Sequence, residues 1–94
     1  LGDIVMAIGA NTDSNYAHQY QLPGTFSATA SYDLLVKAQQ SAEKNGFPYT
    51  VGNVLSSDIF YGETPEWKVW AKMGTLAAEM ESFALYCNAA RAGV

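Results

Sequence analysis

Three short runs of mostly apolar residues divide the chain. They cover residues 3–9, 49–55 and 76–80, and the first is rich in β-branched residues and closed by Gly9. Apolar runs of this length that end at turn residues are typical of strands, and the first run fits a strand buried on both faces. The pattern therefore predicts three strands, separated by polar or irregular segments.

Residues 31–45 show the clearest helical pattern in the chain. Ser31 can cap the first turn, and Gly46 stands where such a helix would end. Apolar residues that share one stripe are Leu35, Ala38 and Ala42. We therefore expect a helix here that packs on this stripe.

A second helix is predicted from Pro65 to Lys72. Proline suits the first turn of a helix, and Thr64 can cap it. The helix carries Trp67 and Trp70 on neighbouring faces, because they lie three residues apart. We expect these two indoles either in the core or at a contact between subunits.

The last predicted helix covers residues 82–92. It places Phe83, Cys87 and Ala90 at helical spacing. Cys87 lies on the inward stripe, so we interpret it as a small buried hydrophobe and not as a nucleophile. A single cysteine cannot form an intrachain disulfide, which suits a reducing cytoplasm.

Residues 10–30 show no sustained period of either strand or helix. An irregular stretch of that length is usually functional, an interface or disordered, and extra strand pairing within it stays open. His18, the one histidine, lies here without Cys, Asp or Glu at ligand spacing, so we expect a surface or interface residue and no metal site. The overall order is βαβαβα, which predicts an α/β fold with a mostly parallel sheet and flanking helices.

Composition suggests part of a larger body. Of the 94 residues, 49% are hydrophobic, 13% are aromatic and only 15% are charged, against about a quarter charged in typical soluble domains. We therefore interpret residues 1–94 as a single partial domain whose two ends are cuts through a larger one. Five basic residues against nine acidic ones argue against nucleic acid and anionic membranes as partners. The apolar stretches are far shorter than a membrane span, which favours a cytoplasmic protein.

The junction at residues 76–82 is the main candidate for a site. Here an apolar strand breaks into a helix, and α/β proteins place ligands at such junctions. In an extended strand Glu79 and Glu81 share a face while Met80 points the other way, so two carboxylates could accept hydrogen bonds from the vicinal hydroxyls of a ribose. The alternative is that Glu81 is simply an acid at a helix N-terminus, where the helix dipole favours it.

Phe60 and Tyr61 form the second candidate. They follow the second predicted strand, where an aromatic face can stack on a purine ring, but by sequence alone an aromatic pair more often belongs to the core. Asp58 is expected to hold the loop by hydrogen bonds to backbone amides and to have no catalytic role. The glycines stand singly, so there is no glycine-rich phosphate loop.

Four segments together resemble one family. They are residues 2–5, 12–14, 57–61 and 79–82, the last reading Glu-Met-Glu-Ser. They resemble the nucleoside phosphorylase superfamily, and most closely the bacterial, hexamer-forming purine nucleoside phosphorylases. The resemblance spans nearly all of the chain but only the central part of a family member, and it implies a phosphorylase-type three-layer fold.

The resemblance also implies roles for the candidate residues. Glu81 would bind the ribose hydroxyls, Met80 would pack against the sugar, and Ala78 would contact the base through its backbone, with Glu79 as a weaker sugar contact. The family often has a larger aliphatic residue where Ala78 stands, which implies a slightly wider base pocket. By the same resemblance Phe60 would line the base site, with Tyr61 as a secondary contact.

The activity that the resemblance implies is phosphorolysis of purine ribo- or deoxyribonucleosides to the base and the sugar 1-phosphate. Inorganic phosphate is the co-substrate, no cofactor is needed, and the family forms homo-oligomers. The family's phosphate-binding Gly and Arg residues lie mostly upstream of the matched region, its leaving-group Asp lies downstream, and Arg91 matches no phosphate ligand. We therefore assign no catalytic residue to this chain and expect weak or no turnover by it alone.

Other functions stay open from the sequence. Within the superfamily, the alternatives are a hydrolytic methylthioadenosine or adenosylhomocysteine nucleosidase and a uridine phosphorylase, which share the Glu-Met-Glu core. Outside catalysis, the alternatives are a nucleoside-binding module and an assembly unit whose exposed sheet edges pair with another copy.

Overall fold

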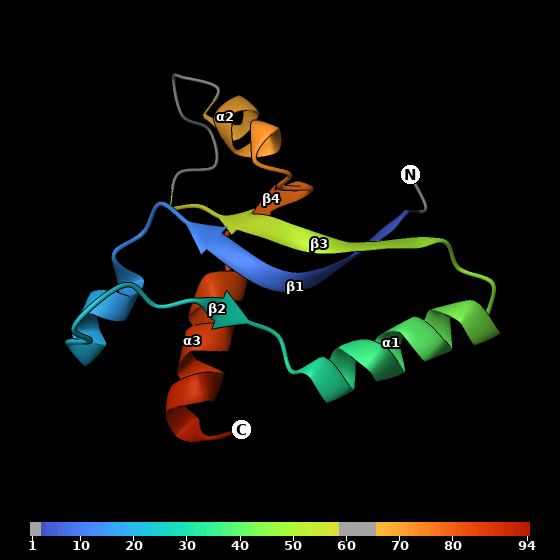
Figure 1. Cartoon of the computed structure of the whole chain (residues 1–94), viewed down its shortest axis with the longest axis horizontal. Helices are drawn as coiled ribbons and strands as arrows, with labels where there is room; N and C mark the ends of the chain where they lie inside the picture. Colours follow the sequence, from blue (N-terminus) through green and yellow to red (C-terminus); the bar gives the residue numbers. More distant parts are fainter. Residues whose placement is uncertain (1–2, 59–65) are drawn as a thin grey trace.

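The computed structural model describes residues 3–58 and 66–94, and it confirms the predicted α/β class (Figure 1). Its elements in chain order are β1 (Ile4–Thr12), the 3₁₀ helix η1 (Tyr16–Tyr20), β2 (Ala28–Thr29), α1 (Tyr32–Lys44), β3 (Tyr49–Ser56), α2 (Trp67–Lys72), β4 (Ala77–Glu79) and α3 (Ser82–Ala92). The three predicted strands and three predicted helices are therefore present. The proposed start of α2 at Thr64 and Pro65 lies outside the described residues.

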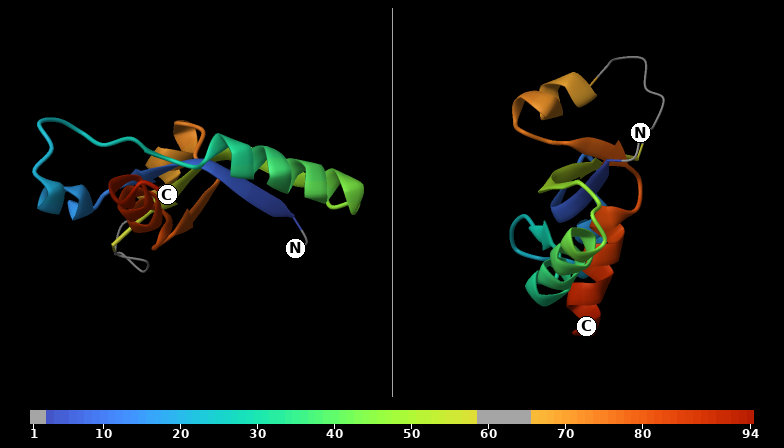
Figure 2. Two further views of the ribbon diagram at one scale, coloured as in Figure 1. Left: turned by 90° about the horizontal axis from the view of Figure 1, so that it is seen from below. Right: turned by 90° about the vertical axis from the view of Figure 1, so that its right-hand side faces the viewer.

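The sheet has four strands in the order β2-β1-β3-β4. β1, β3 and β4 are parallel, whereas the short β2 pairs antiparallel with β1. β2 is the extra pairing left open for residues 10–30, a stretch that also contains the end of β1 and η1. α2 lies beyond β4 on one side of the molecule, and α1 and α3 lie beyond β1 on the other (Figures 1 and 2).

Helix α1 forms for the local reasons that its sequence indicates. The Ser31 side chain accepts a hydrogen bond from the Leu34 amide at 3.5 Å, and Gly46 adopts a φ of 72° that favours glycine just after the helix. On the predicted stripe Leu35 is buried but Ala38 is exposed. The buried stripe is therefore narrower than predicted, because α1 packs mainly against a single strand, β1.

Strand β1 is not buried on both faces, contrary to the prediction. Ile4, Val5 and Ile8 keep 38%, 40% and 42% of their surface exposed, whereas Gly9 and Ala10 are buried. The difference arises because α3 packs against the C-terminal half of β1 and against β2. Among the described residues, fewer side chains pack against the N-terminal half of β1.

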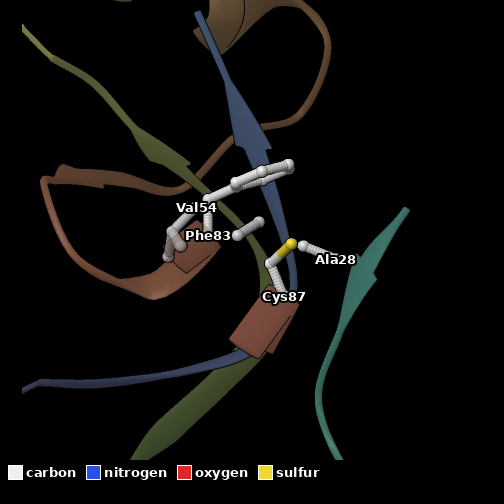
Figure 3. Packing of buried hydrophobic residues seen from close by; sticks show 5 residues of the cluster. Ala28, Val54, Phe83 and Cys87 are labelled. Carbon is white, nitrogen blue, oxygen red and sulfur yellow. The ribbon is translucent and has the colours of Figure 1, made fainter. Parts of the chain in front are cut away.

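The core lies between α3 and the sheet (Figure 3). Its buried members are Ala10, Ala28, Val54, Phe83 and Cys87. The ring of Phe26 meets that of Phe83 edge to face, with 6.1 Å between centroids. The buried state of Cys87 confirms the prediction for that residue, whereas Ala90 on the same helix is exposed.

The two tryptophans of α2 do not belong to this core. Trp67 is 58% exposed and Trp70 is half-buried. The core alternative is therefore wrong for Trp67, since α2 lies beyond β4 and away from the α3 side of the sheet (Figure 1). Within residues 3–58 and 66–94, no helix has the length and apolar character needed to cross a membrane.

Candidate functional site

The parallel strands end together at one edge of the sheet. Thr12 is level with Ser56 in the pairing of β1 with β3, and Ser56 is level with Glu79 in the pairing of β3 with β4. The Thr12 hydroxyl donates to the Ser56 carbonyl at 2.7 Å, and the Ser57 amide donates to the Glu79 carbonyl at 2.8 Å. The residues that follow these strand ends therefore lie at a common carboxyl edge, where open α/β sheets bind ligands.

Asp13 connects two of these strand ends. Its Oδ2 accepts from the Ser57 hydroxyl at 2.7 Å, and its Oδ1 accepts from the Asp58 amide at 3.0 Å. Asp13 therefore holds the start of this loop, with the Asp58 backbone as a donor, while most of the loop that the Asp58 side chain was predicted to hold lies outside the described residues. The only sequence signal for this role of Asp13 was its position immediately after a strand. The sequence does not show its partner, because Ser57 lies 44 residues away along the chain.

The Glu79-Met80-Glu81 junction differs from the geometry expected of a strand. β4 ends at Glu79, and Glu81 has φ −119° and ψ −27°, which is helical backbone. The prediction that both carboxylates share one face of an extended strand is therefore wrong. The physical reason is that the chain turns into α3 between them, so the two-residue alternation stops at Glu79.

An acid does serve the N-terminus of α3, and it is Glu79. Its Oε2 accepts from the Glu81 amide at 2.6 Å and from the Ser82 amide at 2.8 Å. The Glu81 side chain makes no capping bond to the helix; instead its Oε2 accepts from the Met80 amide at 3.3 Å. Glu81 therefore does stand at the N-terminus of α3, as the alternative held, but the carboxylate that bonds the helix amides is that of Glu79.

Three of the candidate side chains face solvent at this edge. Ala78 and Glu81 are exposed, and Met80 keeps 45% of its surface exposed. The exposed carboxylate can accept hydrogen bonds from sugar hydroxyls. The exposed thioether beside it can pack against the carbon face of the same sugar. Phe60 and Tyr61 lie outside the described residues.

Tyr86 lies behind the junction, one turn into α3. Its hydroxyl donates to the Ala7 carbonyl at 2.9 Å and so joins α3 to β1. Burial, and to a lesser extent the charge of Glu79, raises the pKa of the Tyr86 hydroxyl. The sequence analysis did not single out Tyr86, because its partner is a backbone atom of a distant strand.

Two cavities lie away from the Glu79-Met80-Glu81 junction. One of about 460 Å³ is lined by residues of η1 and the following loop, including His18 and Phe26, together with Phe83. Another of about 440 Å³ runs along β1 and β2 and also reaches Phe83. Residues 78–81 line neither of these two cavities, and Ala78, Met80 and Glu81 are exposed. Residues 3–58 and 66–94 contain no group of three or more His, Cys, Asp or Glu side chains placed to hold a metal ion.

A mostly parallel sheet with flanking helices and an acidic carboxyl edge is the class of structure that the phosphorylase-type fold provides. The sequence model of the family described as "Phosphorylase superfamily" matches residues 1–94. The chain therefore belongs to the phosphorylase superfamily.

Its relatives within this superfamily include bacterial proteins named purine nucleoside phosphorylase DeoD-type. The chain is 47% identical to the one from Clostridium beijerinckii over 93 residues, which is 98% of the chain and 39% of that relative. It is 47% identical over 96 residues to the one from Alkaliphilus metalliredigens (100% and 41%), and 40% identical over 91 residues to the one from Geobacillus kaustophilus (97% and 39%). The chain thus spans about 40% of the length of these relatives.

Proposed function

We propose that residues 1–94 form the central part of a purine nucleoside phosphorylase domain. The whole protein would cleave purine ribo- or deoxyribonucleosides with inorganic phosphate to give the base and the sugar 1-phosphate. The observation that carries this proposal is the exposed Met80-Glu81 pair at the carboxyl edge of the sheet. The similarity to the DeoD-type relatives supports it.

The chemistry of nucleoside binding follows from these side chains. The Glu81 carboxylate would accept hydrogen bonds from the vicinal ribose hydroxyls, and such charge-assisted bonds contribute about 1.5–3 kcal/mol each. Met80 would pack on the sugar, and the backbone of Ala78 would contact the base. Phe60 would stack on the purine, with Tyr61 as a secondary contact. Glu79 belongs to the same nucleoside site.

The described residues do not supply the phosphate site. Phosphorolysis needs cations to hold phosphate against the anomeric carbon and an acid to protonate the departing purine. Arg91 is in the last turn of α3, whose first residue is at the carboxyl edge, so its backbone lies about 14 Å from that edge at 1.5 Å per residue. We propose that the remaining part of the longer protein provides these groups.

Assembly and location complete the proposal. Large apolar side chains such as Ile4, Ile8 and Trp67 are exposed on the chain, and surfaces of this kind are commonly covered by further protein. We propose that the rest of the domain and further copies in a homo-oligomer cover them, and that the protein acts in the cytoplasm without a cofactor.

The test is an assay of the chain on inosine and adenosine, with and without phosphate, combined with a titration of inosine followed by tryptophan fluorescence. We expect inosine to change the emission and Glu81→Ala to weaken that binding about tenfold or more, because charge-assisted hydrogen bonds are lost. Glu43→Ala is the matched control, since it removes a carboxylate from α1, away from the edge.

The assay separates the alternatives by its products. Phosphate-dependent formation of ribose 1-phosphate would show that the phosphate and acid groups lie within residues 1–94, in the same or another copy, and not in the rest of the longer protein. Release of free ribose without phosphate would favour a hydrolytic nucleosidase. An absence of both turnover and inosine binding would contradict the proposed function.

A further inference from the structure

Glu79 directs its carboxylate toward the backbone that follows it. The side chain comes from the last residue of β4, and its Oε2 accepts from two consecutive amides, those of Glu81 and Ser82, at 2.6 and 2.8 Å. A carboxylate oxygen has two lone-pair sites. Both acceptor sites of Oε2 are therefore occupied by the chain itself.

The other carboxylate oxygen of Glu79, Oε1, is also inaccessible to a ligand at the surface. Glu79 Oε1 is buried and has no hydrogen-bond partner among residues 3–58 and 66–94. Glu79 as a whole is half-buried, whereas Glu81 is exposed. A sugar hydroxyl at the solvent-exposed edge would meet the Glu81 carboxylate and not that of Glu79.

We infer that Glu79 is a positioning residue for Glu81 and not a ligand of the sugar. This inference rests on the proposed function, because it assigns Glu79 a role in the same nucleoside site. The bond to the Glu81 amide fixes the peptide unit between Met80 and Glu81, and so fixes the direction in which the Glu81 side chain leaves the backbone. The bond to the Ser82 amide fixes the first turn of α3 directly after it.

The same two bonds keep the Glu81 carboxylate out of the helix end. The first amides of an α-helix have no partner within the helix, so a nearby carboxylate is drawn to them. Glu81 stands at the N-cap position and makes no capping bond, while Glu79 bonds two of these amides. Without Glu79, the Glu81 side chain would compete for the amides and turn away from a bound ribose.

A double-mutant cycle tests this role through inosine affinity measured on folded protein. We expect Glu79→Ala to weaken binding about tenfold and to have no further effect in a Glu81→Ala background, since a positioning residue acts only through its target. Glu79→Gln keeps a carbonyl oxygen that can accept both amides, so its affinity should stay within about threefold of the wild type.

Three results would overturn the inference. Equal losses from Glu79→Ala with and without Glu81 would show a direct sugar contact. A loss for Glu79→Gln as large as that for Glu79→Ala would show that the charge itself binds the ligand. A loss of stability in urea with unchanged inosine affinity would show a helix cap with no part in binding.

A measurement without ligand separates this inference from the proposed function. The NMR signals of the Glu81 and Ser82 amides should move in Glu79→Ala, and these amides should exchange faster with solvent than in the wild type. Unchanged amides would overturn the positioning role. If the wild type does not bind inosine, the proposed function fails, and the amide measurement alone decides whether Glu79 holds the Glu81 backbone.

Discussion

The Ser57 hydroxyl donates a 2.7 Å hydrogen bond to Oδ2 of Asp13, so the residue that follows β1 holds the residue that follows β3. The second oxygen of Asp13 accepts from the Asp58 amide at 3.0 Å. These bonds join two loops at the carboxyl edge, immediately before the segment that contains Phe60. The placement of Ser57 and Asp58 therefore depends on an acid that the sequence did not mark as part of the site.

Removal of the Asp13 carboxylate tests this dependence. We expect Asp13→Ala to lower the free energy of unfolding by about 1 kcal/mol, because two exposed hydrogen bonds are lost. Urea denaturation measures this change, and hydrogen exchange should show a faster Asp58 amide. Asp13→Asn keeps one acceptor oxygen and should lose less. An Asp58 amide that exchanges equally slowly in Asp13→Ala would contradict this role.

Gly52 lies where a larger side chain would meet Leu76. A Cβ atom at position 52 would stand 2.6 Å from Leu76 Cδ1 and 3.1 Å from Leu76 Cγ. We expect Gly52→Ala to lower the free energy of unfolding by about 1 kcal/mol, the low end of the cost of overpacking, because the Leu76 side chain that must be displaced is 44% exposed.

A second variant checks that this cost comes from Leu76. Leu76→Ala removes the two atoms that crowd position 52, so Gly52→Ala should cost clearly less in that background. Thermal or urea unfolding of the four proteins measures the coupling. If the cost of Gly52→Ala is the same in both backgrounds, the crowding by Leu76 is not its cause.

Tyr86 should make stability depend on pH in the alkaline range. Its pKa in the folded protein is raised by burial and by Glu79, above the usual value of about 10. A raised pKa means that the folded state holds the proton more tightly, so the contribution to stability is complete below pH 10 and is lost as pH rises through the folded pKa.

Tyr86→Phe isolates this contribution. At neutral pH it should lower the free energy of unfolding by about 0.5–1.5 kcal/mol, because the hydrogen bond to the Ala7 carbonyl is lost. Above pH 10 the difference between wild type and variant should shrink. Tyr49, whose pKa is also raised, first by its hydrogen bond to Glu43, is present in both proteins and does not affect the comparison. A difference that stays constant through the alkaline range would contradict the raised pKa of Tyr86.

The sequence by itself determined the local elements. The Ser31 cap and Gly46 bound α1, the apolar run of residues 49–55 predicts nearly all of β3, and residues 82–92 match α3. These features depend on propensity, capping and periodicity, which act over a few residues. The Glu-Met-Glu-Ser segment also indicated the family correctly, because a motif is read from adjacent positions.

Only the tertiary structure decided which residues meet. The pairing of β2 with β1, the exposure of Ile8 and the bond of Asp13 to Ser57 each depend on segments that are far apart in the chain. Glu79 shows the same limit at short range. Strand alternation predicted that it would share a face with Glu81, but the start of α3 turned the backbone and gave its carboxylate two helix amides instead. A pattern along the chain indicates how each segment folds, whereas the partner of a polar side chain is set by what packing brings beside it.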